Sequence, residues 1–148
     1  MNRIVLACIA LTALLPLQVF AQTGAYPAKR FELVASGNPG GGIACDVRDE
    51  AQVAAFAARV LHDLGTPDII VNNAGIGKFA PVAEMSLETW DAVIETNLRG
   101  MFLVTRAFLP AMLAAGRGMI VNIASSAARN GREGGGAYSA SKHGVLGF

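Results

Sequence analysis

A tyrosine and a lysine, Tyr138 and Lys142, stand four residues apart in the stretch "AYSASKHGV". Residues with this spacing share one face of a helix, so both side chains can enter the same cleft. A phenol ordinarily titrates near pH ~10, and a neighbouring ammonium favours the phenolate and so lowers the pKa of a phenol. The small residues between the two leave room for a flat cofactor or substrate. The pair is therefore a candidate group for proton transfer.

Other polar residues stand where apolar segments end. "NNAG" at 72–75 and "NIASS" at 122–126 each follow a strongly apolar run, and Asn97 falls on the apolar stripe of a predicted helix. A carboxamide on a buried face needs partners, because leaving it unsatisfied costs about 1–3 kcal/mol. Asn97 is thus either a hydrogen-bonded core residue or part of a functional site.

The elements that must position these residues alternate between strands and helices. Strands are predicted at 43–47, 67–75 and 118–125, and helices at 49–65, at 87–115 with a bend near Pro110, and from Tyr138 onward. The inward stripe of the long helix is expected to hold Trp90, Val93, Ile94, Met101, Val104 and Phe108. The strand at 67–75 is too apolar to have a wet face, which favours a central parallel strand. The alternation predicts an α/β fold with a doubly wound parallel sheet, whose ligands bind beyond the carboxyl ends of the strands.

These motifs also suggest a family. "NNAG", Asn97 in "ETNLRG", "NIASS" and "YSASK" occur in the order and spacing of the short-chain dehydrogenase/reductase family, which the sequence resembles from Asp46 to Phe148. The resemblance implies a partial Rossmann-like domain at 43–148. It also implies an NAD(P)-dependent oxidoreductase that moves a hydride between nicotinamide and a small-molecule carbonyl or secondary alcohol. No residue pattern chooses between NAD and NADP.

The resemblance implies a catalytic role for each of four residues. Tyr138 would act as the acid and base, and Lys142 would hold the nicotinamide ribose, so both would also contact the cofactor. Ser125, thirteen residues before Tyr138, would hydrogen-bond the substrate oxygen in preference to its neighbour Ser126. Asn97 would anchor a water relay to Lys142.

The remaining cofactor contacts implied by the resemblance lie nearer the start of the domain. Asp46 and Val47 match the family's adenine contact, and Asn73, Ala74 and Gly75 match the wall beside the adenosine. No metal ligand is assigned.

The N-terminal residues 1–21 have the pattern of a secretory signal peptide: a charge at Arg3, an apolar run, and small residues at Val19 and Ala21. A genuine leader would predict export, whereas the family resemblance implies a cytoplasmic protein. An apolar core helix, or an unrelated sequence joined upstream, would give the same pattern. No membrane span is expected in the mature chain.

The segment at 22–42 is expected to be irregular, and the family's T-G-x-x-x-G-x-G phosphate turn is not recognisable in it. "TGAY" at 23–26 begins that turn and then fails, while Gly37 and Gly41 have the right interval but Ile43 replaces the last glycine. Without the family's first strand, an edge of the 67–75 strand would be exposed. The alternative function is therefore a catalytically silent fragment or chimera, with weak or undetectable binding of NAD(H) and NADP(H).

Length and charge limit the other classes. The chain has 148 residues and a formal net charge of +1, which suits one domain and gives no electrostatic reason to expect nucleic acid as a partner. A complete family member would be expected to pair with itself through its long helices. A third hypothesis, an exported serine acyl-transferase, rests on Ser139 and Lys142 in "SASK", but no Lys-Thr-Gly follows.

Overall fold

A five-stranded sheet forms the centre of the molecule, and the computed structural model describes residues 4–7, 32–36 and 43–148. Its strands are β1 (Ile4–Ala7), β2 (Glu32–Ser36), β3 (Ile43–Ala44), β4 (Ile69–Asn72) and β5 (Met119–Asn122), in the spatial order β3-β2-β1-β4-β5. β1, β4 and β5 pair in parallel, whereas β2 runs antiparallel to both of its neighbours. The predicted α/β fold with a parallel sheet is confirmed, with β2 as an antiparallel member.

β1 covers the edge of β4 that was expected to be exposed. Ile4 to Ala7 pair in parallel register with Ile69 to Asn72, so the expectation of an open edge was wrong. The strand lies in the apolar segment that was interpreted as a leader. An apolar run can equally form a strand, because pairing in a sheet satisfies its backbone N–H and C=O groups. The rest of that segment, "TGAY" and the candidate phosphate turn at 37–42 lie outside the described residues, and the signal peptide stays a prediction.

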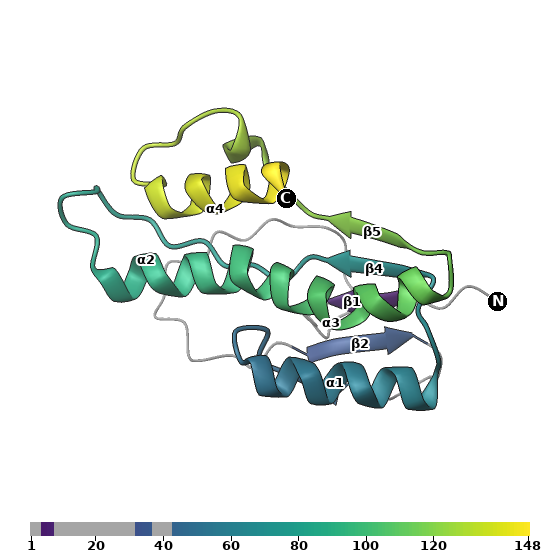
Figure 1. Cartoon of the computed structure of the whole chain (residues 1–148). Coiled ribbons are helices and arrows are strands. Elements are labelled where there is room, and N and C mark those ends of the chain that lie inside the picture. The colour runs from purple at the N-terminus through teal and green to yellow at the C-terminus, as the bar shows by residue number, and fades with distance from the viewer. Residues whose placement is uncertain (1–3, 8–31, 37–42) are drawn as a thin grey trace, which may run out of the picture.

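The helices are α1 (Glu50–Asp63), α2 (Leu87–Ile94), the π-helical turn η1 (Glu95–Arg99), α3 (Gly100–Ala114), the short 3-10 helix η2 (Ser126–Ala128) and α4 (Gly136–Gly147). α1 begins at Asp49, whose carboxylate accepts hydrogen bonds from the backbone N–H groups of Ala51 and Gln52. Figure 1 shows α1 and α3 on the same face of the sheet, and α4 beyond the ends of β4 and β5. Phe56 of α1 meets Phe108 of α3 edge to face in the core, with 5.9 Å between ring centroids.

The long helix expected at 87–115 is interrupted at η1, whereas Pro110 lies inside α3. The Thr96 hydroxyl donates to the carbonyl of Ala92 at 2.7 Å within this region. A π-turn holds more residues than an α-turn, so the inward face before η1 is out of phase with the face after it. For this reason the prediction that Trp90 points inward was wrong, and its exposed fraction is 40%.

A buried polar cluster joins β4, β5 and α3. The Asn72 side-chain amide donates to the hydroxyl of Thr105 at 3.0 Å and to the side-chain oxygen of Asn122 at 2.8 Å. Because both asparagines end their strands, the cluster fixes the carboxyl ends of β4 and β5 relative to each other. The loops that leave these ends form the candidate site.

Candidate active site

A cavity of about 530 Å³ opens at the carboxyl ends of β4 and β5, beside α4. It is lined by Asn73, Gly75, Ile76, Gly77, Phe79, Ile123, Ala124, Ser125, Ser126, Ala127, Asn130, Gly131, Arg132, Tyr138 and Lys142. Among the residues singled out in the sequence, six line this cavity: Asn73, Gly75, Ser125, its neighbour Ser126, Tyr138 and Lys142. The fold thus brings together residues that lie up to seventy positions apart in the chain.

Tyr138 and Lys142 occupy one face of α4, one turn apart. The Lys142 side-chain nitrogen lies 5.9 Å from the centroid of the Tyr138 ring and donates to the carbonyl of Ile123 at 2.7 Å. Only 5% of Lys142 is exposed, and this burial lowers the pKa of its ammonium. An ammonium has three donors, so two remain after the bond to Ile123.

Asn97 lies directly behind the cavity, in η1, and is buried. Its amide nitrogen donates to the Ile76 carbonyl at 2.9 Å and to the Ser141 hydroxyl at 3.0 Å, and its oxygen accepts from the Ile76 N–H at 2.7 Å. The predicted buried position beside the Lys142 segment of α4 is confirmed. These bonds clamp the loop after β4, and one lone pair of the Asn97 oxygen is left for a further donor.

Gly75 lets that loop approach Asn97 and Lys142 closely. A Cβ atom at this position would lie 3.2 Å from the side-chain oxygen of Asn97 and 3.6 Å from the side-chain nitrogen of Lys142. A larger residue would therefore enter the space between the two polar groups. The glycine keeps the backbone of "NNAG" in contact with the cavity.

Both serines after β5 line the cavity. The Ser125 hydroxyl accepts a hydrogen bond from the Ala127 N–H at 3.2 Å, which caps η2, and its own proton is donated to no described residue. Ser126 is the more exposed of the two. The preference for Ser125 as the substrate-facing hydroxyl stays a prediction.

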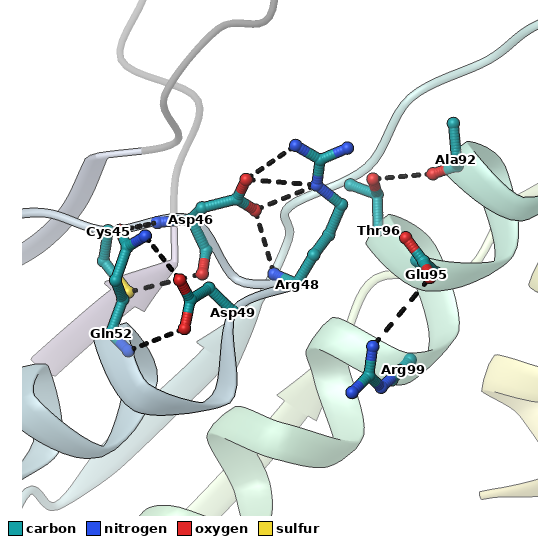
Figure 2. A network of polar contacts seen from close by, with 9 residues as sticks. All are labelled: Cys45, Asp46, Arg48, Asp49, Gln52, Ala92, Glu95, Thr96 and Arg99. Carbon is teal, nitrogen blue, oxygen red and sulfur yellow. Dashed lines mark hydrogen bonds and ion pairs between the residues drawn. The ribbon is translucent and has the colours of Figure 1, made fainter. Parts of the chain in front are cut away.

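Three residues expected to contact the cofactor do not line the cavity: Asp46 and Val47, expected at the adenine, and Ala74, expected beside the adenosine. Figure 2 shows the Asp46 carboxylate held by the Arg48 guanidinium, with the closest nitrogen and oxygen 2.6 Å apart. This hydrogen-bonded ion pair lowers the pKa of Asp46. The Val47 side chain is buried, with Gly100 of α3 above it, and Ala74 packs against the core. A contact between these three residues and a cofactor stays a prediction.

Phe79 and Arg132 are among the residues of the cavity that sequence reasoning did not single out. The Phe79 ring lies 5.9 Å from the Tyr138 ring between centroids, and the Arg132 guanidinium carbon lies 4.8 Å from the Phe79 centroid. Their positions, shortly after "NNAG" and six residues before Tyr138, offered a signal, because both segments leave the strand ends.

Two further findings concern the described part of the chain alone. No helix within it is long and apolar enough to cross a membrane. No group of three or more His, Cys, Asp or Glu side chains within it is placed to hold a metal ion.

The parallel strands β1, β4 and β5, with a cavity holding a tyrosine and a lysine at the carboxyl ends of β4 and β5, define an α/β protein with its candidate site at the strand ends. The short chain dehydrogenase family model matches residues 23–148, so the chain belongs to this family.

Individual relatives agree with this assignment. The chain is 48% identical to a D-threitol dehydrogenase from Mycolicibacterium smegmatis, over 72% of this chain and 41% of the relative. It is 45% identical to a putative ketoacyl reductase from Streptomyces coelicolor, over 79% of this chain and 46% of the relative. A solved metagenomic short-chain oxidoreductase in complex with NADP matches with a TM-score of 0.69 and 48% identity, over 71% of this chain and 48% of that one. The chain therefore spans about half the length of these relatives, and the predicted cofactor, NAD or NADP, agrees with the last of them.

Proposed function

We propose that the chain is the catalytic part of an NAD(P)-dependent oxidoreductase acting on a carbonyl compound or a secondary alcohol. The observation that carries the proposal is the buried Lys142 ammonium, which stands beside the Tyr138 ring at the wall of the cavity and keeps donors beyond its bond to Ile123. A buried ammonium is costly, so its retention at a cavity wall favours a functional role over a packing role.

The described residues fit the ribose end of a dinucleotide. Two donors remain on Lys142, and Gly75 brings the backbone to within reach of the same space, where a side chain would crowd Asn97. Lys142 and Tyr138 would hold the nicotinamide ribose, and Asn73 and Gly75 would form the wall beside the adenosine. A nicotinamide bound there would supply or accept the hydride.

The chain's own residues would then transfer the proton and bind the substrate oxygen. In reduction the Tyr138 hydroxyl gives its proton to the carbonyl oxygen, and in oxidation the phenolate takes the hydroxyl proton. Ser125 donates a hydrogen bond to the same oxygen. Asn97 keeps the Ile76 loop in position through its clamp and offers its remaining lone pair to a relay water.

The test compares turnover with cofactor binding in the full chain. Tyr138→Phe keeps the ring that contacts Phe79 but removes the proton, so we expect turnover of carbonyl substrates to fall at least about a hundredfold while cofactor affinity changes little. Glu133→Ala, an exposed substitution in the loop before α4 that does not line the cavity, is the matched control and should leave turnover within about twofold of the original protein. Loss of turnover in both variants alike would contradict the role of the phenol.

The silent-fragment alternative makes the opposite prediction. A folded chain that binds neither NADH nor NADPH in calorimetry and turns over no carbonyl compound would support it and overturn the proposal. Circular dichroism on the same sample establishes that the chain is folded. This measurement matters because the candidate phosphate turn at 37–42 lies outside the described residues.

A further inference from the structure

Arg132 is a cation without an ion-pair partner at the wall of the cavity. Among the described residues no carboxylate lies within ion-pair distance of its guanidinium. Five other arginines of the described chain do have such partners, namely Arg48, Arg59, Arg99, Arg106 and Arg117. Among the described residues Arg129 also has none, but it does not line the cavity. The planar fork of Arg132 is therefore available for a ligand.

Arg132 is nevertheless held in a defined place. Its guanidinium carbon stacks 4.8 Å from the centroid of Phe79, a contact typical of cation–π pairs. Its carbonyl accepts from the Gly135 N–H at 2.9 Å, and the neighbouring Gly134 carbonyl accepts from the Ala80 N–H at 2.9 Å. The loop that carries Arg132 is thus hydrogen-bonded to the segment that carries Phe79.

The Phe79 ring contacts both the reactive group and this cation. It lies 5.9 Å from the Tyr138 ring between centroids and 4.8 Å from the Arg132 guanidinium carbon, so it links the guanidinium to the phenol. Within the lining of the cavity the charged residues are Arg132 and Lys142, and no Asp or Glu side chain belongs to it. Because the Lys142 ammonium is buried and bound to Ile123, Arg132 is the accessible positive charge at this wall.

We propose that Arg132 selects carbonyl or secondary-alcohol substrates that carry a carboxylate. A guanidinium fork binds a carboxylate through two parallel N–H···O bonds, a geometry that neither a lysine nor a neutral residue reproduces. The carboxylate lies against Arg132 while the carbonyl oxygen reaches Tyr138 and Ser125. The inference rests on the proposed function, which it deepens by naming the substrate class.

Keto acids and their neutral esters provide the test. Levulinate and methyl levulinate differ only in the charged group, as do 5-oxohexanoate and its methyl ester. We expect Arg132→Gln to raise KM for the keto acids about ten- to a hundredfold, the effect of one charge-assisted bidentate contact, and to leave KM for the esters unchanged. Arg132→Lys should recover only part of the loss, because its ammonium lacks the fork.

Two controls separate local from general effects. Arg59→Gln removes one positive charge from the exposed face of α1 and should leave both KM values unchanged. Phe79→Leu removes the stacking surface but keeps Arg132, so it should raise KM for the acids by a smaller factor. A loss with Arg129→Gln but not with Arg132→Gln would overturn the assignment, since Arg129 lines the adjoining hollow beside Ser125.

A binding measurement separates this inference from the proposed function. If the esters are not turned over, the proposed function fails; calorimetry with levulinate on the full chain then still decides the role of Arg132. Levulinate binding that is lost in Arg132→Gln supports the inference, and absence of binding overturns it. Dihydroxyacetone phosphate, compared with dihydroxyacetone, tests whether a phosphate takes the place of the carboxylate. If Arg132→Gln raises KM for the phosphate compound but not for the keto acids, the carboxylate assignment is overturned.

Discussion

Replacing Asn97 by alanine tests how the site is held together. The side chain is 2% exposed and makes three hydrogen bonds, two of them to the backbone of Ile76 and one to Ser141. Each bond contributes about 0.5–1.5 kcal/mol net, and the partly buried N–H and carbonyl of Ile76 would lose their partner. We therefore expect Asn97→Ala to lower the free energy of unfolding by about 2–4 kcal/mol.

This loss is a large fraction of the stability of an ordinary domain, which is about 5–15 kcal/mol. With a urea dependence of about 2 kcal/mol per molar, the midpoint of unfolding should fall by roughly 1–2 M. The single tryptophan, Trp90, lies on α2 next to η1 and reports the transition by fluorescence, with circular dichroism as the second probe.

Asn130→Ala is the matched control, because Asn130 is exposed and its side chain makes no hydrogen bond to another described residue. It should change the free energy of unfolding by less than about 0.5 kcal/mol. If Asn97→Ala stays within this same range, the three bonds do not hold the loop, and the reasoning is refuted.

Two further predictions concern packing and pH. Gly100→Ala should destabilise the fold by about 1 kcal/mol despite the better helix propensity of alanine, because the new Cβ would lie 2.7 Å from a methyl carbon of Val47. The control is Gly147→Ala, which has open space around it and should be neutral or stabilising in the same urea titration. Burial lowers the pKa of Lys142 in the folded chain, so between that pKa and the ordinary value of 10.5 the unfolded chain binds more protons and stability rises with pH. The unfolding free energy of the original protein minus that of Lys142→Met should therefore increase as the pH is raised above neutrality toward about 10, and a flat difference would contradict the buried charge.

Much of the site was predictable because its signals are local. Tyr138 and Lys142 share a face of α4 through helical period alone, and Asn73, Gly75 and Ser125 follow apolar strands whose parallel ends meet at one edge. The buried position of Asn97 followed from its place on an apolar stripe. The same stripe failed for Trp90, because a π-turn changes the helical phase and leaves no clear mark in the hydrophobic pattern.

The sequence by itself determined the α/β class, the helical pairing of Tyr138 with Lys142, and the family. Only the tertiary structure decided that Ile4–Ala7 form a strand beside β4, that Asn97 clamps Ile76, and that Phe79 contacts both Tyr138 and Arg132. Periodicity specifies which residues of one element share a face, since that depends on backbone geometry within the element. Contacts between segments far apart in the chain depend on how whole elements pack, and no local spacing encodes them.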